Sequence, residues 1–186
     1  GGGVRVDVNA GDYTIADAFT LLPFSNTLVT LEMTGAEIVA ALEDALDYGL
    51  SPEGSSGAYP YASGLRYDVD ASQTKGSRFS NIEINTRLNG DWTNIDATAT
   101  YRVVTNNYIA GGRDGYTTFG DVSNAGKVID TYTEYAQGFI DYVESLTAQG
   151  QSLQKLPLAE YSTKSYIDSA GCNHASENNC GDNGSL

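Results

Sequence analysis

The segment 106–116 carries the residues of this chain whose types are best suited to contact a ligand. It combines the glycine pair Gly111 and Gly112 with the acid Asp114 and the aromatic residue Tyr108. Glycine lacks a Cβ atom, so backbone N–H groups can approach a ligand closely, and an aspartate accepts hydrogen bonds from hydroxyl groups. A lone glycine pair is more often a tight turn that only reverses the chain. The segment therefore predicts a binding loop only together with features elsewhere in the sequence.

Two other segments carry related signals. The chain begins with a glycine run that ends in the cation Arg5. In the segment 58–67, Tyr59 precedes Pro60, and a residue before proline is restricted to extended conformations. We therefore expect Tyr59 to present its ring from a loop and not from the face of a helix. From composition alone, the glycine run would be interpreted as a flexible chain end.

The strands that must position these loops are indicated by hydrophobic alternation. Such patterns predict strands over 4–8, 27–33, 65–70, 82–84, 92–95 and 101–105. Asn89 and Gly90 lie between two of these strands, and an Asn-Gly pair favours a type I′ hairpin turn. The last strand leads the chain directly into the glycine-rich segment.

Helices are predicted where an N-cap residue precedes apolar residues that recur at helical spacing. Thr14 is a candidate N-cap, and Thr34 with Glu37 forms a capping box before a clear amphipathic pattern. Thr131 with Glu134 gives a second box, which predicts a helix that ends near residue 150. Because strands and helices intermix without strict alternation, the sequence predicts an α+β fold with mixed sheets and packed helices.

Length and composition limit the organisation and the partners. The 186 residues fit one core, and we expect a domain over 1–150 followed by a C-terminal extension over 151–186. With 10 Lys and Arg against 24 Asp and Glu, the net charge of −14 argues against polynucleotide binding and against an anionic membrane surface. Binding of a small anionic ligand is still compatible with this net charge, because a few arginines can lie together at one site. The start of the chain resembles neither a signal peptide nor an initiator, so we expect an N-terminal truncation.

The two cysteines, Cys172 and Cys180, lie in the polar C-terminal segment. Their spacing predicts a small disulfide loop, which implies an oxidising compartment, periplasmic or extracellular. His174 lies between them and leaves a metal site as the alternative, although three ligands at this spacing match no common zinc framework.

Taken in order, the segments 1–5, 59–67 and 107–116 resemble the C-terminal, substrate-recognition domain of the 5′-nucleotidase family of secreted metallophosphoesterases. This family includes UDP-sugar hydrolases and cyclic-nucleotide phosphodiesterases, and the resemblance covers roughly 1–145. It implies that the fold is that of this domain. It also implies that the chain recognises a nucleotide or nucleoside and that the protein carries an N-terminal metallophosphoesterase domain.

The resemblance also assigns roles to single residues. A nucleobase would be clamped between the rings of Tyr59 and Tyr108, Asp114 would accept hydrogen bonds from ribose hydroxyls, and Arg5 would reach the nucleotide. Gly111 and Gly112 would form the loop, in which Arg113 stands where many members have another glycine. Each stacking contact of this kind contributes about 1 to 3 kcal/mol and tolerates any base.

Catalysis in the family occurs at a two-metal site that uses several histidines, and this chain has one histidine. We therefore expect no catalytic residue and no metal ligand here, and place two divalent metal ions in the N-terminal domain. The leading hypothesis is the nucleotide-binding domain of a secreted, metal-dependent phosphohydrolase. The alternative is a stand-alone nucleoside-binding or structural module without catalysis. The sequence leaves open whether the substrate is that of a 5′-nucleotidase, a UDP-sugar hydrolase, a cyclic phosphodiesterase or a nuclease fusion.

Overall fold

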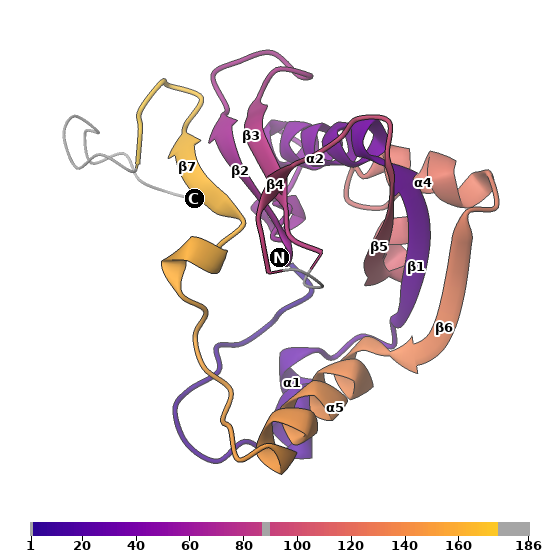
Figure 1. The fold of residues 1–186 in the computed structure, drawn as a ribbon, viewed down its shortest axis with the longest axis vertical. Helices are drawn as coiled ribbons and strands as arrows, with labels where there is room; N and C mark the ends of the chain where they lie inside the picture. The colour runs from indigo at the N-terminus through magenta and orange to yellow at the C-terminus, as the bar shows by residue number, and fades with distance from the viewer. Residues whose placement is uncertain (1, 87–89, 175–186) are drawn as a thin grey trace.

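A computed structural model describes residues 2–86 and 90–174, and Figure 1 shows the arrangement of their helices and strands. The strands are β1 (Thr27–Thr34), β2 (Leu65–Asp70), β3 (Phe79–Ile84), β4 (Thr93–Asn94), β5 (Thr100–Asn106), β6 (Val128–Glu134) and β7 (Thr163–Ile167). The helices are α1 (Ile15–Leu21), α2 (Gly35–Leu50), α3 (Asn107–Ala110), α4 (Thr117–Asn124) and α5 (Tyr135–Ala148), with short 3-10 turns at η1 (Ser56–Ala58) and η2 (Leu158–Glu160).

The strands form two sheets. The first has the order β5-β1-β6, and both neighbours run antiparallel to β1. The second has the order β4-β3-β2-β7, in which β7 runs parallel to β2 and the other pairs are antiparallel. The predicted α+β fold with mixed sheets is confirmed. The division of the chain at residue 150 stays a prediction, but β7 comes from the expected extension and pairs within the second sheet.

Helix α2 lies between the two sheets and is apolar on two faces (Figure 1). On one face Ala41 and Ala45 join a buried cluster that includes Leu31 of β1. On the other face Leu42 and Leu46 join a second buried cluster with residues of β2 and β3, namely Tyr67, Val69 and Phe79. A helix covered on two sides needs a wider apolar surface than one stripe, and this explains the mostly apolar sequence from 38 to 46.

An acid on α2 fixes the helix that follows the glycine-rich segment. The Asp44 carboxylate accepts hydrogen bonds from the backbone N–H of Thr118 at 2.8 Å and from the hydroxyl of Thr117 at 2.7 Å. Lys75 pairs with the same carboxylate at 2.7 Å. Burial alone would raise the pKa of Asp44, but the hydrogen bonds from Lys75 and the threonines outweigh it and hold the pKa below its usual value. Asp44 therefore anchors the first turn of α4 to α2.

Local sequence signals predicted several elements correctly. Thr14 caps α1 as expected, and the predicted capping box of Thr34 with Glu37 is formed. The strand over 65–70 is confirmed, and the strands expected over 27–33 and 101–105 are one or two residues longer than predicted. The expected hairpin turn at Asn89 and Gly90 includes residues that lie outside the described part of the chain, so it stays a prediction.

Two predictions were wrong. Residues 4–8 form no strand, and Val4, Val6 and Val8 are exposed. Thr131 and Glu134 form no capping box: both lie in β6, and the Thr131 hydroxyl donates to the carbonyl of Leu28. Glu134 pairs with Thr27 of β1, and an irregularity in the pairing, with Tyr132 at a φ of +59°, precedes it. Helix α5 begins at the next residue, Tyr135.

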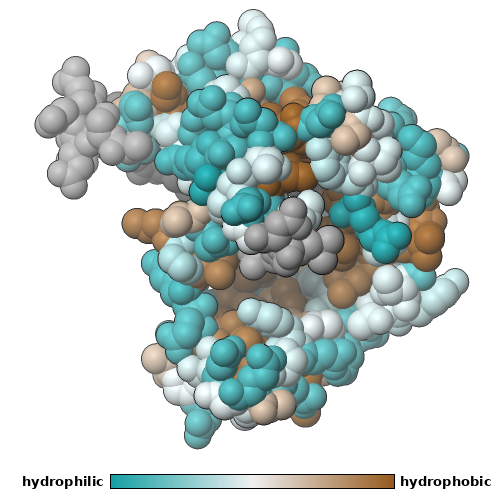
Figure 2. Space-filling model, viewed as in Figure 1, coloured by the Kyte–Doolittle hydropathy of each residue, from teal (hydrophilic) through white to brown (hydrophobic). Residues whose placement is uncertain are grey.

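Helices α1 and α5 pack on each other at a distance from the second sheet (Figure 1). Figure 2 shows hydrophobic surface inside the hollow that separates this pair from the rest of the molecule. Helix α5 buries Ala136 and Ile140, whereas Tyr142 is half exposed. Within residues 2–86 and 90–174, no helix combines the length and apolar character that a membrane span requires.

Candidate functional site

The glycine-rich segment begins with one turn of helix and ends in a run of left-handed backbone. Asn106 caps α3 by accepting a hydrogen bond from the N–H of Ile109 at 2.8 Å. Gly112 and Gly115 have φ values of +79° and +78°, and Asp114 between them has a φ of +52°. An aspartate tolerates this conformation better than most residues, at a modest energetic cost. The loop therefore holds the Asp114 backbone in an uncommon geometry.

Tyr108 and Asp114 are direct partners in this loop. The Tyr108 hydroxyl donates to Oδ1 of Asp114 at 3.1 Å. This hydrogen bond is the main reason why the pKa of the Tyr108 phenol lies above its usual value. The Tyr108 side chain is 46% exposed, so much of its ring faces solvent. Two of the residues expected to contact a nucleoside are thus within contact distance of each other.

The glycines of the loop serve close packing as well as backbone geometry. A Cβ atom on Gly112 would lie 3.3 Å from the Cα of Gly120 in α4. A Cβ atom on Gly115 would lie 2.2 Å from the Cβ of Tyr48 in α2, a distance that real structures do not contain. Gly111 is exposed and has an ordinary negative φ. A Cβ atom on Gly111 would lie 3.3 Å from the carbonyl oxygen of Asn107, so positive φ distinguishes Gly112 and Gly115 from Gly111.

The second predicted ring, Tyr59, follows the short turn η1 and is largely covered. It packs against the second buried cluster, and its hydroxyl shares a hydrogen bond of 2.7 Å with Oγ1 of Thr163. Burial raises the pKa of Tyr59 to about 12. The neighbouring Tyr61 is 73% exposed, and its ring centroid lies 4.8 Å from that of Tyr59.

A buried hydrogen bond joins the two loops. The hydroxyl of Tyr116, at the end of the glycine-rich segment, donates to the carbonyl of Ala58 at 2.9 Å. Ala58 directly precedes Tyr59, and both loops also pack against the C-terminal half of α2. The structure therefore brings the segments of Tyr59 and Tyr108 together at one end of α2.

The N-terminal glycine run reaches the same region. The N–H of Gly2 donates to the carbonyl of Gly57 at 2.8 Å, which connects the run to the loop of Tyr59. Arg5 is exposed, its guanidinium donates to the carbonyl of Gly2 at 3.3 Å, and it lies 6.0 Å from the ring centroid of Phe24. Across residues 2–86 and 90–174, no carboxylate forms a salt bridge with Arg5. Its charge is therefore not neutralised by a described neighbour.

The C-terminal segment places three potential metal ligands close together. The ligand atoms of Asp168, Cys172 and His174 lie within 4.8 Å of one another, and Nε2 of His174 is 3.1 Å from Oδ2 of Asp168. The backbone N–H of Cys172 donates to the other oxygen of Asp168 at 2.9 Å. The predicted partner Cys180 lies outside the described residues, so the disulfide stays a prediction. One histidine and one carboxylate do not match the donor set of a two-metal hydrolase site.

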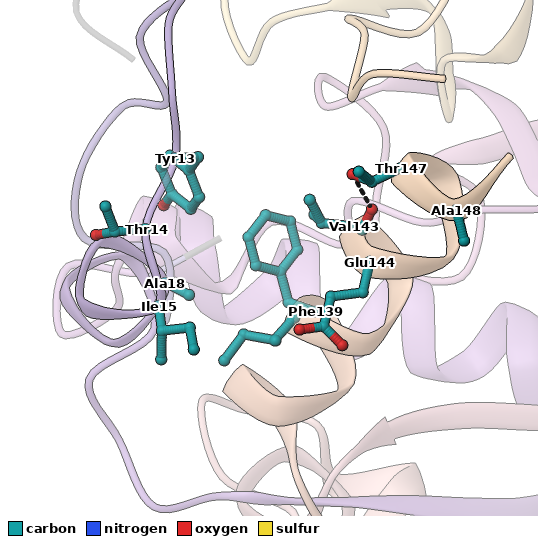
Figure 3. A pocket seen from close by; sticks show the side chains of 10 residues that line it. Tyr13, Thr14, Ile15, Ala18, Phe139, Val143, Glu144, Thr147 and Ala148 are labelled. Carbon is teal, nitrogen blue, oxygen red and sulfur yellow. Dashed lines mark hydrogen bonds between the residues drawn. The ribbon is translucent and has the colours of Figure 1, made fainter. Parts of the chain in front are cut away.

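A groove of about 450 Å³ lies between α1 and α5, away from these loops (Figure 3). Phe139 and Val143 point into it from α5, and Tyr13 covers it from the segment before α1. The groove contains none of the residues predicted to bind a nucleoside. No pattern in the sequence indicated this groove or the contacts of Tyr116 and Thr163. A strand signal in the β-branched and aromatic run 161–167 could have indicated that the extension joins the sheet.

Comparison with known proteins matches residues 1–121 to the family model described as 5′-nucleotidase, C-terminal domain. The NAD 5′-nucleotidase of Haemophilus influenzae is 42% identical over 146 residues, which cover 77% of this chain and 24% of that protein. The probable 5′-nucleotidase of Treponema pallidum is 40% identical over 145 residues, which cover 77% of this chain and 24% of that protein.

Solved structures agree with these sequence matches. The structure of Haemophilus influenzae NAD nucleotidase matches with a TM-score of 0.73 at 41% identity, covering 77% of this chain and 26% of the solved one. The chain spans about a quarter of the length of the curated relatives described above. The resemblance seen in the three glycine- and tyrosine-bearing segments is confirmed, and the chain belongs to the 5′-nucleotidase C-terminal domain family.

Proposed function

We propose that this chain is the base- and ribose-recognition domain of a secreted, metal-dependent 5′-nucleotidase-type phosphohydrolase. The observation that carries the proposal is the pairing of Tyr108 with Asp114 in a glycine loop that is joined, through Tyr116 and Ala58, to the loop of Tyr59. An exposed ring, a charged acceptor and a second ring at one end of α2 suit a nucleoside. The names of the relatives, NAD 5′-nucleotidase and probable 5′-nucleotidase, support the same class of ligand.

Asp114 is the group expected to select the sugar. Its Oδ1 accepts from Tyr108, and Oδ2 receives no hydrogen bond from the residues that the structure describes. A carboxylate oxygen in this position can accept from a ribose hydroxyl, and such a charged hydrogen bond contributes about 1.5 to 3 kcal/mol. The rings of Tyr59 and Tyr108 would stack on either face of the base without reading its edge. Recognition should therefore favour ribonucleosides and discriminate weakly among bases.

Catalysis is assigned to the part of the protein that lies outside this chain. The relatives are about four times as long as the matched region, which leaves room for a separate catalytic domain. Two divalent metal ions there would activate water and polarise the phosphate ester. Secretion is proposed because a Cys172–Cys180 disulfide requires an oxidising compartment.

The decisive experiment is a calorimetric titration of adenosine against the full chain and its Tyr108→Ala variant. Loss of the ring should weaken binding by about 1 to 3 kcal/mol, because one stacking contact is removed. Tyr142→Ala is the matched control, since Tyr142 is 52% exposed on α5 and Tyr108 is 46% exposed. The control should bind as the unmodified chain does. Equal affinity of Tyr108→Ala and Tyr142→Ala would remove Tyr108 from the site.

The role of Asp114 can be separated from that of the ring in the same assay. The Asp114→Asn variant should lose most of the preference for adenosine over 2′,3′-dideoxyadenosine, because the charged acceptor for the sugar hydroxyls is gone. A variant that keeps the full preference would show that Asp114 does not contact the ribose.

A further inference from the structure

Helix α4 begins directly after the glycine-rich segment, but its own chain supplies no side-chain cap. Tyr116 occupies the N-cap position, and its side chain forms no capping hydrogen bond. The first turn of a helix leaves backbone N–H groups without a partner inside the helix, and a side-chain acceptor that reaches them stabilises the helix start. For α4 this acceptor comes from α2, in the carboxylate of Asp44.

The two oxygens of Asp44 have different partners. Oδ2 accepts from the backbone N–H of Thr118 at 2.8 Å and from the hydroxyls of Thr117 and Thr118 at 2.7 and 2.6 Å. Oδ1 lies 2.7 Å from Nζ of Lys75, in the connection between β2 and β3. The Asp44 side chain is only 8% exposed, so these contacts are shielded from water. Hydrogen bonds to a charged acceptor are stronger than those between neutral groups, and Asp44 therefore holds the first turn of α4 firmly.

The shape of the glycine-rich segment depends on where α4 lies. A Cβ atom on Gly120 of α4 would lie 3.2 Å from the Cα of Gly112. The N–H of Thr117, the first residue of α4, donates to the carbonyl of Gly115 at 2.7 Å. Because Gly112 and Gly115 lie on either side of Asp114, α4 contacts the loop both before and after this residue. A shift of α4 would therefore move the loop.

We propose that Asp44 is a positioning residue of the nucleoside site: by capping α4 from α2, it fixes the loop that carries Tyr108 and Asp114. This inference rests on the proposed function, because it concerns the placement of two groups expected to contact the ligand. Asp44 is buried and both of its oxygens have protein donors, so it acts on the ligand only through the loop. A loop that is held in place before the ligand arrives loses less conformational freedom on binding, which strengthens affinity without a new contact.

The test measures adenosine binding to the full chain by calorimetry in variants of Asp44. Asp44→Ala leaves the first turn of α4 without its cap, and affinity should fall on the order of tenfold, the factor to which the loss of a helix cap corresponds. Asp44→Asn keeps an oxygen acceptor on a side chain of the same shape and removes the charge, so it should recover part of the affinity. Failure of Asp44→Asn to bind better than Asp44→Ala would contradict the capping role.

Glu43→Ala is the matched control. Glu43 precedes Asp44 on α2 and is also buried, at 3% exposed. Its Oε1 accepts from the backbone N–H groups of Arg78 and Phe79 at 2.7 and 3.2 Å, so it holds the start of β3 and not α4. Glu43→Ala should lower the stability of the protein and leave adenosine affinity unchanged. An equal loss of affinity in the two alanine variants would show that Asp44 acts through stability alone, which overturns the inference.

Amide hydrogen exchange tests the step between Asp44 and the loop without a ligand. The N–H groups of Gly112 and Tyr116 form hydrogen bonds within the glycine-rich segment, at 2.9 and 3.2 Å. Relative to the core amides of the same variant, these two should exchange faster in Asp44→Ala than in Glu43→Ala, because only the first variant releases α4. Equal relative rates in the two variants would mean that Asp44 does not hold the loop.

The two proposals fail in different ways. Normal affinity of Asp44→Ala together with weak binding by Tyr108→Ala would overturn the role of Asp44 and leave the nucleoside site intact. Absence of adenosine binding by the unmodified chain would overturn both. If Asp44→Ala does not fold, Thr118→Val takes its place, because it removes a hydroxyl donor from the other side of the contact, and Thr118→Ser should restore the affinity that Thr118→Val loses.

Discussion

Tyr59 and Tyr108 differ in how the protein holds each ring. Tyr59 packs against the second buried cluster, and the extension binds its hydroxyl through Thr163. Tyr108 is 46% exposed, and its hydroxyl bonds to Asp114 within the same loop. The Tyr59 ring thus packs against the core of the protein, whereas the Tyr108 ring is held within the local segment 108–114. In the proposed nucleoside site, Tyr59 would therefore be the rigid ring and Tyr108 the more mobile one.

The largest expected effect contrasts the two rings by their contribution to folding. Tyr59→Ala should lower the free energy of unfolding by about 2 to 3 kcal/mol, because it leaves a cavity beside the second cluster. Tyr108→Ala should change it by less than about 0.5 kcal/mol, as expected for an exposed side chain. Urea unfolding followed by circular dichroism gives both values. Equal losses in the two variants would contradict the distinction between a core ring and a surface ring.

The second prediction tests whether the contact between Gly115 and Tyr48 fixes the end of the loop that carries Tyr108. Gly115→Ala should destabilise the protein by about 1 to 2 kcal/mol more than Gly126→Ala, because the new methyl group would overlap the side chain of Tyr48. Gly126 is a matched control, since both glycines have a φ of +78° and a Cβ atom on Gly126 would meet nothing within 4 Å. The same unfolding assay applies.

The difference between the two glycines isolates the contact with Tyr48 from the cost of positive φ. Similar losses at Gly115 and Gly126 would mean that only the backbone conformation matters, and that Tyr48 moves aside. In that case the contact with Tyr48 would not fix the end of the loop that carries Tyr108.

The third prediction uses alkaline pH. The pKa of Tyr59 is about 12, mainly because of burial, whereas an unfolded tyrosine titrates near 10. The folded state therefore keeps a proton that the unfolded state loses, so this contribution to stability is complete below pH 10 and falls as pH rises toward 12. Tyr59→Phe removes the titrating group, and its stability should decline less steeply over this range.

Unfolding midpoints in urea at pH 9, 10 and 11 measure that slope. The pKa of Tyr108 is also raised, first through its hydrogen bond to Asp114, so Asp114→Asn should lower it. Ultraviolet titration of tyrosinate detects the change. A slope for Tyr59→Phe that matches the unmodified chain would show that the ring is more hydrated than the structure indicates.

The smallest effect is expected at the end of the extension. We predict that Cys172 and Cys180 are bonded to each other, which mass spectrometry of unreduced peptides can establish. Reduction should leave adenosine affinity unchanged, because β7 is held by β2 and not by the cysteines. Two free thiols would contradict the disulfide. A stoichiometric metal that is lost in His174→Ala would support instead a metal site formed by Asp168, Cys172 and His174.

The sequence by itself determined the features that depend on a few neighbouring residues. Thr34 and Glu37 lie three positions apart, so the capping box and the start of α2 could be predicted from spacing alone. The order of the glycine and tyrosine segments likewise identified the family. The proximity of Tyr108 and Asp114 followed from their place in one short loop.

The tertiary structure decided what depends on distant partners. The same type of spacing at Thr131 and Glu134 gave no helix start, because both residues belong to β6, in which Glu134 pairs with Thr27 and the Thr131 hydroxyl donates to the carbonyl of Leu28. Val4, Val6 and Val8 alternate like a strand but have no pairing partner among the described residues, and they remain exposed. The contact between Tyr59 and Thr163 joins residues 104 positions apart through the parallel pairing of β2 with β7. Local patterns carry no information about such a pairing, since its free energy arises only when the sheet brings the two segments together.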